Sequence, residues 1–351
     1  MNPVVSSLDE LTPDWLTEAL GANGGARVSS VTTQQIGTGQ IGTSHRLTLS
    51  YDGRPGPATL VAKLAAGDDD ARSRVAGGYA KEVGFYTHLA PTVDVRTPRC
   101  WYSAITDDNT NFTLLLDEVT AASPGVQAEG CSAAQARGAV RNLAGLHASR
   151  WNAPALRDHA FLAPASPEMA ALLGDVLVDA TDSFIKRYDD RLDHDDKTTL
   201  RTVAHAITTW HLARPEPYAI VHGDYRLDNL MFPHDGNDVT ALDWQTVTLA
   251  PPARDLAYFL GTSLPTGARR AHQEELVAHY HQQLLARSVS GYDADTCWDD
   301  YRLGQLQGPL ITVLGCIYVT ADPTERSDGM FMAMATRSCA AIRDLASIEL
   351  L

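Results

Sequence analysis

The sequence predicts an α+β protein with a small antiparallel sheet in its N-terminal part and a larger, mainly helical C-terminal part. Between residues 28 and 64, short segments of alternating or β-branched apolar residues are separated by Gly, Pro and Asp turns, a pattern typical of strands. After Ser123-Pro124-Gly125 the sequence becomes mainly helical in pattern, interrupted by the segment 219–244. We therefore expect one domain over residues 1–119 and a second over residues 120–351.

The N-terminal part starts with a helix signal at Thr12-Pro13-Asp14, where an N-cap residue precedes a proline in the first turn. Glycines after Leu20 end this helix. The acidic run Asp68-Asp69-Asp70 is expected to be a loop, followed by a second helix over 74–89. Strands are expected over 31–36, 44–51, 58–64, 98–104 and 111–119.

The C-terminal part carries long segments that favour helices and one short segment that favours strands. Helices are expected over 132–149, 167–188, 195–212, 253–262, 268–287, 294–318 and 328–347. Within the segment 219–244, the apolar run before His222 and the run Val239–Leu242 predict short strands. Polar residues that follow these strands would be held at the strand ends.

The composition of the chain argues against several classes of partner and location. The formal net charge of −15 argues against a nucleic acid or an anionic membrane surface as a partner, because both require a basic footprint. The five cysteines lie far apart without any Cys-x-x-Cys, a pattern typical of a reduced, cytoplasmic protein. No signal-peptide pattern is found at the N-terminus, and no apolar run is long enough to insert into a membrane.

Residues 222–229 read His-Gly-Asp-Tyr-Arg-Leu-Asp-Asn, and Asp243 follows within Ala-Leu-Asp-Trp. This pattern places Asp224, Asn229 and Asp243 on two short segments joined by a turn rich in Gly, Asn and Asp. Phosphoryl transfer from ATP requires a carboxylate that orients the attacking hydroxyl, together with oxygen ligands that hold Mg²⁺ against the phosphates. The segment therefore predicts a kinase-type site, with Asp224 as the catalytic carboxylate and with Asn229 and Asp243 as metal ligands.

A glycine motif, Gly-x-Gly-x-x-Gly, is formed by Gly37, Gly39 and Gly42. A dinucleotide-binding loop of this form must open a helix. Here the motif is followed by residues 43–51, whose apolar residues alternate as in a strand. Strand–loop–strand is the arrangement of a glycine-rich flap over phosphates. An ordinary hairpin turn remains the alternative.

These motifs resemble those of the aminoglycoside phosphotransferase and choline kinase group of small-molecule kinases, which are distant relatives of the protein kinases. The resemblance rests on residues 222–229, on Asp243, and on Arg254-Asp255-Leu256-Ala257-Tyr258, a helix start that follows the metal-binding loop. It implies a bilobal protein-kinase-like fold and the transfer of phosphate from ATP, with Mg²⁺, to a hydroxyl of a small molecule. The candidate acceptors are an amino sugar or aminoglycoside, a sterol-like alcohol, a hydroxyacyl thioester and an amino alcohol.

The resemblance also implies roles on the nucleotide side. Lys63 lies inside an apolar strand and would contact the α- and β-phosphates, and Glu82 on the following helix would orient it. A solvated Glu82 is the alternative. The strand end at Asp117 and Val119 occupies the position of a kinase hinge, where backbone groups meet adenine.

Other polar residues near the motifs are expected to support the structure. His222 would fix the loop by a hydrogen bond, Asp255 would bond the loop backbone, and His147 would be a satisfied core residue. Arg226 and Asp228 would either face the substrate or pin the loop.

Two other function classes remain open at this stage. A nucleotide-binding pseudokinase with a regulatory role is disfavoured because Lys63, Asp224, Asn229 and Asp243 are all present. A dinucleotide-dependent oxidoreductase is disfavoured because the glycine motif is followed by a strand pattern.

Overall fold

The computed structural model describes residues 4–21, 27–37, 42–162, 164, 166–234, 239–320 and 323–351. The chain folds into two compact units. The first unit comprises the described residues within 1–92, 97–120 and 243–246, and the second comprises those within 93–96, 121–242 and 247–351. The chain thus returns to the first unit for a short segment that starts at Asp243.

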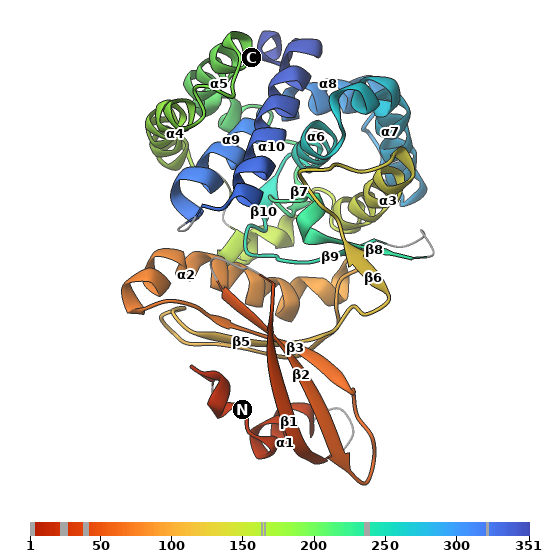
Figure 1. The fold of residues 1–351 in the computed structure, drawn as a ribbon. Coiled ribbons are helices and arrows are strands. Elements are labelled where there is room, and N and C mark those ends of the chain that lie inside the picture. The colour runs from red at the N-terminus through yellow and green to blue at the C-terminus, as the bar shows by residue number, and fades with distance from the viewer. Residues whose placement is uncertain are drawn as a thin grey trace. The chain divides into compact units, whose positions relative to one another are not determined.

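An antiparallel sheet forms the centre of the first unit (Figure 1). Its strands are β1 (Arg27–Ile36), β2 (Gly42–Asp52), β3 (Thr59–Ala65), β4 (Cys100–Ile105) and β5 (Phe112–Asp117), in the order β1-β2-β3-β5-β4. Lys63 lies in the middle strand, opposite Ser44 on one side and Leu114 on the other. Its strand neighbours Ala62 and Leu64 are buried, so the sheet gives this lysine a fixed backbone.

Helices of the first unit pack on this sheet. They are η1 (Leu8–Glu10), α1 (Pro13–Gly21), α2 (Asp69–Gly84) and the short turns η2 (Phe85–Leu89) and η3 (Ala90–Thr92). Leu16 of α1 packs with Leu47 and Leu60 of the sheet. Helix α2 starts earlier than expected, because Asp68 accepts a hydrogen bond from Ala71 N at 2.8 Å as the N-cap. The acidic run is therefore a helix start, where the positive end of the helix dipole favours carboxylates.

The second unit is mainly helical, with short strands that flank the predicted catalytic segment. Its helices are α3 (Ala133–Ser149), α4 (Pro167–Arg187), α5 (His194–Leu212), α6 (Ala253–Ser263), α7 (Thr266–Ala286), α8 (Ala294–Gly304), α9 (Gln307–Leu314) and α10 (Glu325–Asp344). Short helical turns are η4 (Pro154–Asp158), η5 (Ala160–Leu162), η6 (Leu227–Asn229), η7 (Gly315–Val319) and η8 (Ser347–Leu350). Strand β7 (Ala219–Val221) pairs with β10 (Thr248–Ala250), and β8 (Leu230–Pro233) lies between β6 (Ala122–Pro124) and β9 (Thr240–Ala241).

One expected helix of the second unit is divided. The range 294–318 forms α8, α9 and the turn η7 instead of one continuous helix. Gln305 N bonds to Arg302 O and Gly308 N bonds to Gln305 O, so tightened turns separate α8 from α9. Gly304 lies so close to α6 that an added Cβ would come within 2.8 Å of Ala253 O. A side chain at this position would therefore not fit between α8 and α6.

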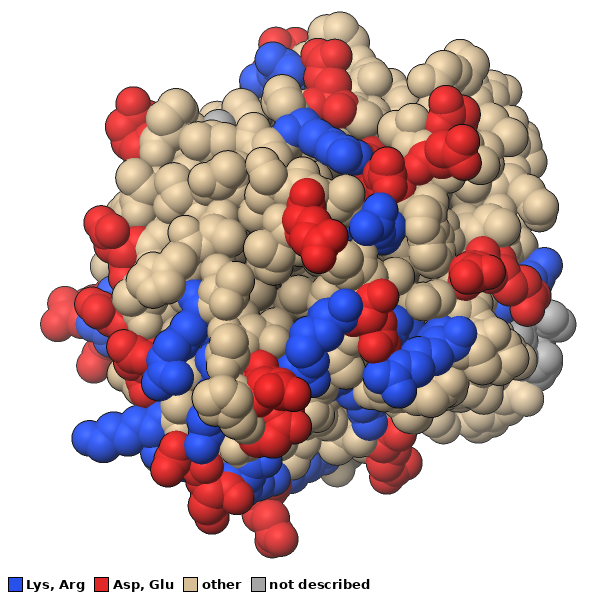
Figure 2. All heavy atoms as spheres, turned by 90° about the horizontal axis from the view of Figure 1, so that it is seen from above, with Lys and Arg blue, Asp and Glu red and all other residues tan. Residues whose placement is uncertain are grey.

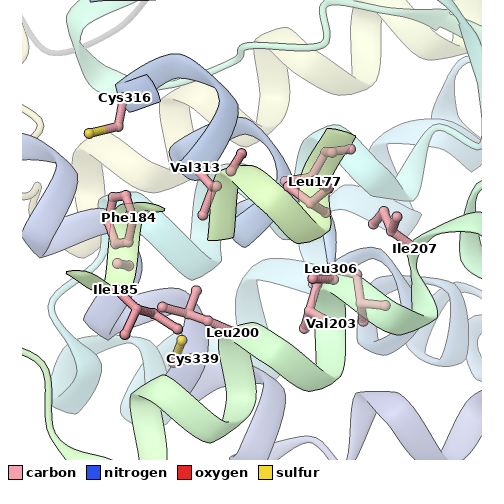
Figure 3. Close-up of a cluster of buried hydrophobic side chains, with 14 of the residues drawn as sticks. Leu177, Phe184, Ile185, Leu200, Val203, Ile207, Leu306, Val313, Cys316 and Cys339 are labelled. Atoms are coloured by element: carbon pink, nitrogen blue, oxygen red, sulfur yellow. The ribbon is translucent and has the colours of Figure 1, made fainter. Parts of the chain in front are cut away.

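A large apolar cluster holds α4, α5, α9 and α10 together (Figure 3). The cluster contains Leu177 and Phe184 of α4, Val203 and Ile207 of α5, Val313 of α9 and Cys339 of α10. In the described part of the chain, no helix is both long enough and apolar enough to cross a membrane.

The C-terminal end of α5 is capped by a buried arginine. Arg254 lies over the Trp210 ring at 3.9 Å and donates from Nη2 to Trp210 O and His211 O, each at 3.1 Å. Burial, and next the charge of Arg254, lower the pKa of His211 to about 4 from 6.5. A neutral His211 is therefore part of the folded state near neutral pH.

This histidine makes stability depend on pH. The unfolded chain protonates His211 at a higher pH than the folded chain does, so its contribution is complete above the unfolded pKa and is lost as the pH falls toward 4. Between these two pH values, we expect the free energy of unfolding of His211→Gln to fall by ~1–2 kcal/mol less than that of the wild type. Urea unfolding between about pH 7 and pH 4 measures this, and His194→Gln, an exposed position on the first turn of α5, is the control. Equal curves for wild type and His211→Gln would contradict the assignment.

Candidate active site

Asp224 is held by three side chains of the second unit. Its carboxylate accepts hydrogen bonds from Tyr258 Oη at 2.6 Å, Asn229 Nδ2 at 3.0 Å and Arg226 Nε at 3.1 Å. The side chain nevertheless remains 20% exposed. A carboxylate that is fixed in orientation and still reachable suits the binding of a substrate hydroxyl.

The backbone before Asp224 is fixed by Asp255, at the start of α6. Its carboxylate accepts from His222 N at 2.6 Å and from Gly223 N at 2.9 Å. Gly223 has φ +84°, a conformation that favours glycine, and its carbonyl accepts from Gln307 Nε2 at 3.0 Å. His222 Nε2 lies 2.9 Å from Leu242 O. The expected loop-fixing parts of His222 and Asp255 are therefore confirmed by these contacts.

His147 is a core residue, as expected. It is completely buried, with Nδ1 2.7 Å from Tyr280 Oη and Nε2 3.4 Å from Asp255 Oδ2. Through Asp255, this buried pair supports the backbone that leads to Asp224.

Asp228 pins the loop from its other side. Arg226 Nη1 donates to Asp228 Oδ2 at 2.7 Å, and Asp228 Oδ1 accepts from Gln127 N at 3.0 Å. Gln127 Oε1 in turn accepts from Leu227 N at 2.8 Å. Of the two alternatives for Asp228, the contacts favour the structural one.

Tyr258 is a site residue that the sequence argument missed. It is fully buried, and its hydroxyl makes the shortest of the hydrogen bonds to Asp224. Burial, followed by the negative charge of Asp224, raises the pKa of Tyr258 well above its usual value, so the hydroxyl remains a donor. A signal was present, since Tyr258 lies three residues after Asp255 and thus on the same helix face.

Replacing Tyr258 by Phe removes this donor and little volume. We expect kcat to fall by about 10–100-fold, because a hydrogen bond to a charged group is worth ~1.5–3 kcal/mol. The KM for the nucleotide should change little, because the Tyr258 hydroxyl bonds to Asp224 and not to a residue assigned to the nucleotide. Steady-state kinetics of the wild type and Tyr258→Phe measure this effect. The control is Tyr301→Phe, because Tyr301 is another fully buried tyrosine and its hydroxyl contacts Gln273. An unchanged kcat in Tyr258→Phe would mean that Asp224 needs no such support.

Asn229 and Asp243 carry the oxygen atoms that the sequence assigns to a metal. Asn229 Nδ2 donates to Asp224 O at 2.9 Å and to Asp224 Oδ2, which leaves the amide oxygen as the atom suited to a cation. Asp243 has φ +62°, a left-handed conformation that Asp tolerates better than most residues. An amide oxygen and a carboxylate are each hard ligands of the kind that Mg²⁺ accepts from proteins. No group of three or more His, Cys, Asp or Glu that could form a closed metal cage occurs among the described residues.

Lys63 forms two ion pairs within the first unit. Its Nζ lies 2.8 Å from Glu82 Oε1 and 2.8 Å from Asp243 Oδ1. The Glu82 side chain is 1% exposed, so the alternative of a solvated glutamate is wrong. Burial alone would lower the pKa of Lys63, but the Asp243 and Glu82 carboxylates outweigh it and raise that pKa above its usual value. Burial raises the pKa of Glu82, and the positive charge of Lys63 opposes this increase without cancelling it.

The glycine motif connects two paired strands. Ile36 at the end of β1 lies opposite Ser44 in β2, and Gly37 has φ +70°. Gly42 opens β2, where an added Cβ would lie 3.0 Å from Leu64 O. Gly39 lies outside the described residues. Because the motif opens a strand and not a helix, the arrangement does not fit a dinucleotide-binding loop.

Asp117 and Val119 lie at the end of β5, where the hinge was expected. Asp117 N donates to Arg99 O, and its carboxylate accepts from Trp101 Nε1 at 2.6 Å. Val119 follows the strand and is half-buried. The Asp117 side chain thus serves the sheet, and only backbone atoms of this segment suit the recognition of a base.

Comparison with known proteins places the chain in a family. A model of the ecdysteroid kinase-like family matches residues 40–289. The chain belongs to this family. A 61-residue segment is 44% identical to mouse acyl-CoA dehydrogenase family member 10, but this match covers 16% of the chain and 6% of the mouse protein.

Solved structures share the fold of this ecdysteroid kinase-like protein. Choline kinase from Cryptosporidium parvum has a TM-score of 0.57 at 9% identity, covering 97% of this chain and 95% of that one. Plasmodium vivax ethanolamine kinase has a TM-score of 0.54 at 12% identity, covering 93% and 86%. The GDP complex of aminoglycoside 2′-phosphotransferase-IIIa has a TM-score of 0.54 at 15% identity, covering 88% and 93%. The expected protein-kinase-like fold is confirmed, and its family makes the protein a small-molecule kinase.

Proposed function

We propose that the protein transfers the γ-phosphate of ATP, in a Mg²⁺-dependent reaction, to a hydroxyl of a small molecule. The observation that carries the proposal is the environment of Asp224, a partly exposed carboxylate oriented by Tyr258, Asn229 and Arg226. Such a carboxylate is what a kinase needs to orient an attacking hydroxyl.

In the proposed step, the acceptor hydroxyl donates a hydrogen bond to Asp224. Its oxygen bonds to the γ-phosphorus as the bond between that phosphorus and the β–γ bridging oxygen breaks, and ADP leaves. The hydroxyl proton passes to the Asp224 carboxylate. Because the transition state is loose, positioning and electrostatic stabilisation supply most of the acceleration.

Lys63 would bind the α- and β-phosphates, since its ammonium is kept charged and is oriented by Glu82. Gly37, Gly39 and Gly42 would let the backbone approach the phosphates, because they lack a Cβ. The backbone from Asp117 to Val119 would meet the adenine. Asn229 and Asp243 would hold Mg²⁺, which neutralises phosphate charge when bound.

The acceptor class is inferred from the family description, not from the charge beside Asp224. The Arg226 guanidinium lies 3.1 Å from that carboxylate, and Arg226 Nη1 also contacts Met330 Sδ at 3.0 Å near the start of α10. Arg226 is paired with both Asp224 and Asp228, so these three groups together carry a net negative charge and do not exclude an acceptor that contains an ammonium. The family description favours a sterol-like alcohol over the other candidate acceptors.

The test is ATP consumption with Mg²⁺ across a panel of sterols, hydroxyacyl thioesters, choline, ethanolamine and aminoglycosides. Acceptor-dependent turnover that disappears in Asp224→Ala would support the proposal and identify the acceptor. Turnover that persists in Asp224→Ala would overturn it. ATP-induced thermal stabilisation without turnover on any acceptor would favour the alternative of a regulatory pseudokinase.

A further inference from the structure

One side of helix α9 begins at the catalytic loop. Gln307, the first residue of α9, donates from Nε2 to Gly223 O at 3.0 Å, and Gly223 directly precedes Asp224. Ile311 and Leu314 follow Gln307 at spacings of four and seven residues, which places them on the same side of the helix. A row of apolar side chains therefore starts beside the backbone that carries the catalytic carboxylate.

The rest of the second unit covers this row only in part. Ile311 and Leu314 are half-buried and pack against the large apolar cluster with part of their surface. In the turn η7, which continues α9, Tyr318 is 60% exposed and Val319 is 43% exposed. These four residues, which we call the apolar row, extend over ~10 Å at the rise of a helix. Three other residues of the same segment are at most 5% exposed and belong to the cluster (Figure 3): Leu310, Val313 and Cys316.

Met330 of α10 brings a further apolar side chain to the catalytic loop. Its Sδ lies 3.0 Å from Arg226 Nη1, and its side chain is partly buried against the same cluster. Helices α9 and α10 approach closely, because a Cβ added at Gly315 would lie 3.5 Å from the Phe331 ring. The apolar row and Met330 thus come from two adjacent helices, each of which contacts the segment around Asp224.

The apolar row lies in an uncharged part of the chain. From Leu303 to Thr320 the sequence contains no Asp, Glu, Lys or Arg, whereas acidic and basic side chains are interleaved on the face shown in Figure 2. Asp328, two residues before Met330, already accepts from Arg187 Nη2 and Tyr188 Oη, each at 2.7 Å. An acceptor that carries a charge on its skeleton would find no charged partner on the apolar row, and burying that charge would be costly.

We propose that the apolar row and Met330 bind the skeleton of the acceptor, and that the acceptor is a neutral, largely apolar alcohol whose hydroxyl reaches Asp224. This inference rests on the proposed function, because Asp224 has to orient that hydroxyl. Apolar side chains that cover such a skeleton supply affinity in proportion to the area removed from water. The apolar row therefore determines which alcohol is accepted, whereas Asp224 acts on its hydroxyl.

The test is calorimetric titration of the full chain with two neutral steroid alcohols, ecdysone and oestradiol, in the presence of Mg²⁺ and a saturating non-hydrolysable ATP analogue. We expect saturable binding of at least one steroid to the wild type, and binding about tenfold weaker in Tyr318→Ser and in Leu314→Gln. Tyr318→Phe keeps the apolar ring and should bind as the wild type does. Leu285→Ser is the matched control, because Leu285 is 48% exposed on α7, outside the apolar row.

Two results would overturn the inference. The first is absence of saturable binding of both steroids to the wild type, or equal binding by the wild type and the two weakened variants. The second is a dimer that sedimentation detects in the wild type and not in Tyr318→Ser, because the apolar row would then join two copies of the chain. Thermal melting checks the fold, and the exposed position of Tyr318 keeps the test valid if Leu314→Gln does not fold.

Turnover separates this inference from the proposed function. With ATP and Mg²⁺, Tyr318→Ser should raise the KM for the steroid about tenfold, while kcat and the KM for ATP change little. A fall in kcat without a change in that KM would contradict the inference. Steroid binding that depends on the apolar row but gives no turnover would count against the proposed function only.

Discussion

Replacing Asp224 by Ala is expected to lower kcat by ~10²–10⁴-fold while leaving nucleotide binding largely intact. The acceptor hydroxyl would lose the group that orients it and takes its proton. The contacts of Asp224 lie within the catalytic loop and with Tyr258, whereas Lys63 and Glu82 are held in the first unit by their own ion pairs. Steady-state turnover assays measure kcat, and calorimetric titration with the nucleotide measures its affinity, so the two effects can be separated.

The fold of the variant is protected by the surrounding contacts. Arg226 keeps its ion pair with Asp228 at 2.7 Å, and the loop backbone keeps its bonds to Asp255. Asp182→Ala, at a carboxylate that is 68% exposed on α4, controls for the loss of one surface charge. Near-normal kcat in Asp224→Ala would show that the assigned mechanism is wrong.

Much of the site could be predicted because local chemistry required it. Lys63 lies inside an apolar strand, and a buried ammonium requires a partner, so burial predicted that this lysine is paired. Glu82 was the candidate partner by the resemblance, with a solvated Glu82 as the alternative. Asp255 could be assigned to the loop because an acid at a helix start can accept from backbone N–H groups. The second ion pair of Lys63, with Asp243, was not anticipated. The two residues lie 180 positions apart in the sequence, and a contact over that separation leaves no local sequence pattern.

Other features depend on contacts that leave no local pattern. Gln127 and Gln307 bind the catalytic loop backbone from about 100 and 84 residues away, and neither has a neighbouring residue that indicates this. The division between α8 and α9 occurs at tightened turns around Gln305, where Gly304 approaches α6 closely. The start of α2 was misjudged for a different reason, because three consecutive aspartates indicate a loop as readily as a capped first turn.

Replacing Asp243 by Asn is expected to weaken Mg²⁺-dependent ATP binding as well as turnover. The change removes a charged metal ligand, so the loss should exceed the ~10–100-fold that removal of a supporting outer-shell partner costs. Asn is the better variant because φ at this position is +62°, which Asn tolerates and which strains Ala by ~1–2 kcal/mol. Lys63 retains its ion pair with Glu82 at 2.8 Å, so the lysine stays in place.

The decisive measurement is the affinity for ATP with and without Mg²⁺ in wild type and variant. If Asp243 holds the ion, Mg²⁺ should strengthen ATP binding in the wild type, and this gain should shrink in Asp243→Asn while the metal-free affinity changes little. Asp52→Asn, an exposed carboxylate at the end of β2 in the same unit, controls for charge. An equal gain from Mg²⁺ in both proteins would show that Asp243 does not hold the ion and would favour a part in positioning Lys63. The ligand of the metal would then have to be sought elsewhere, and the ion pair with Lys63 at 2.8 Å would be a sufficient reason for a carboxylate at this position.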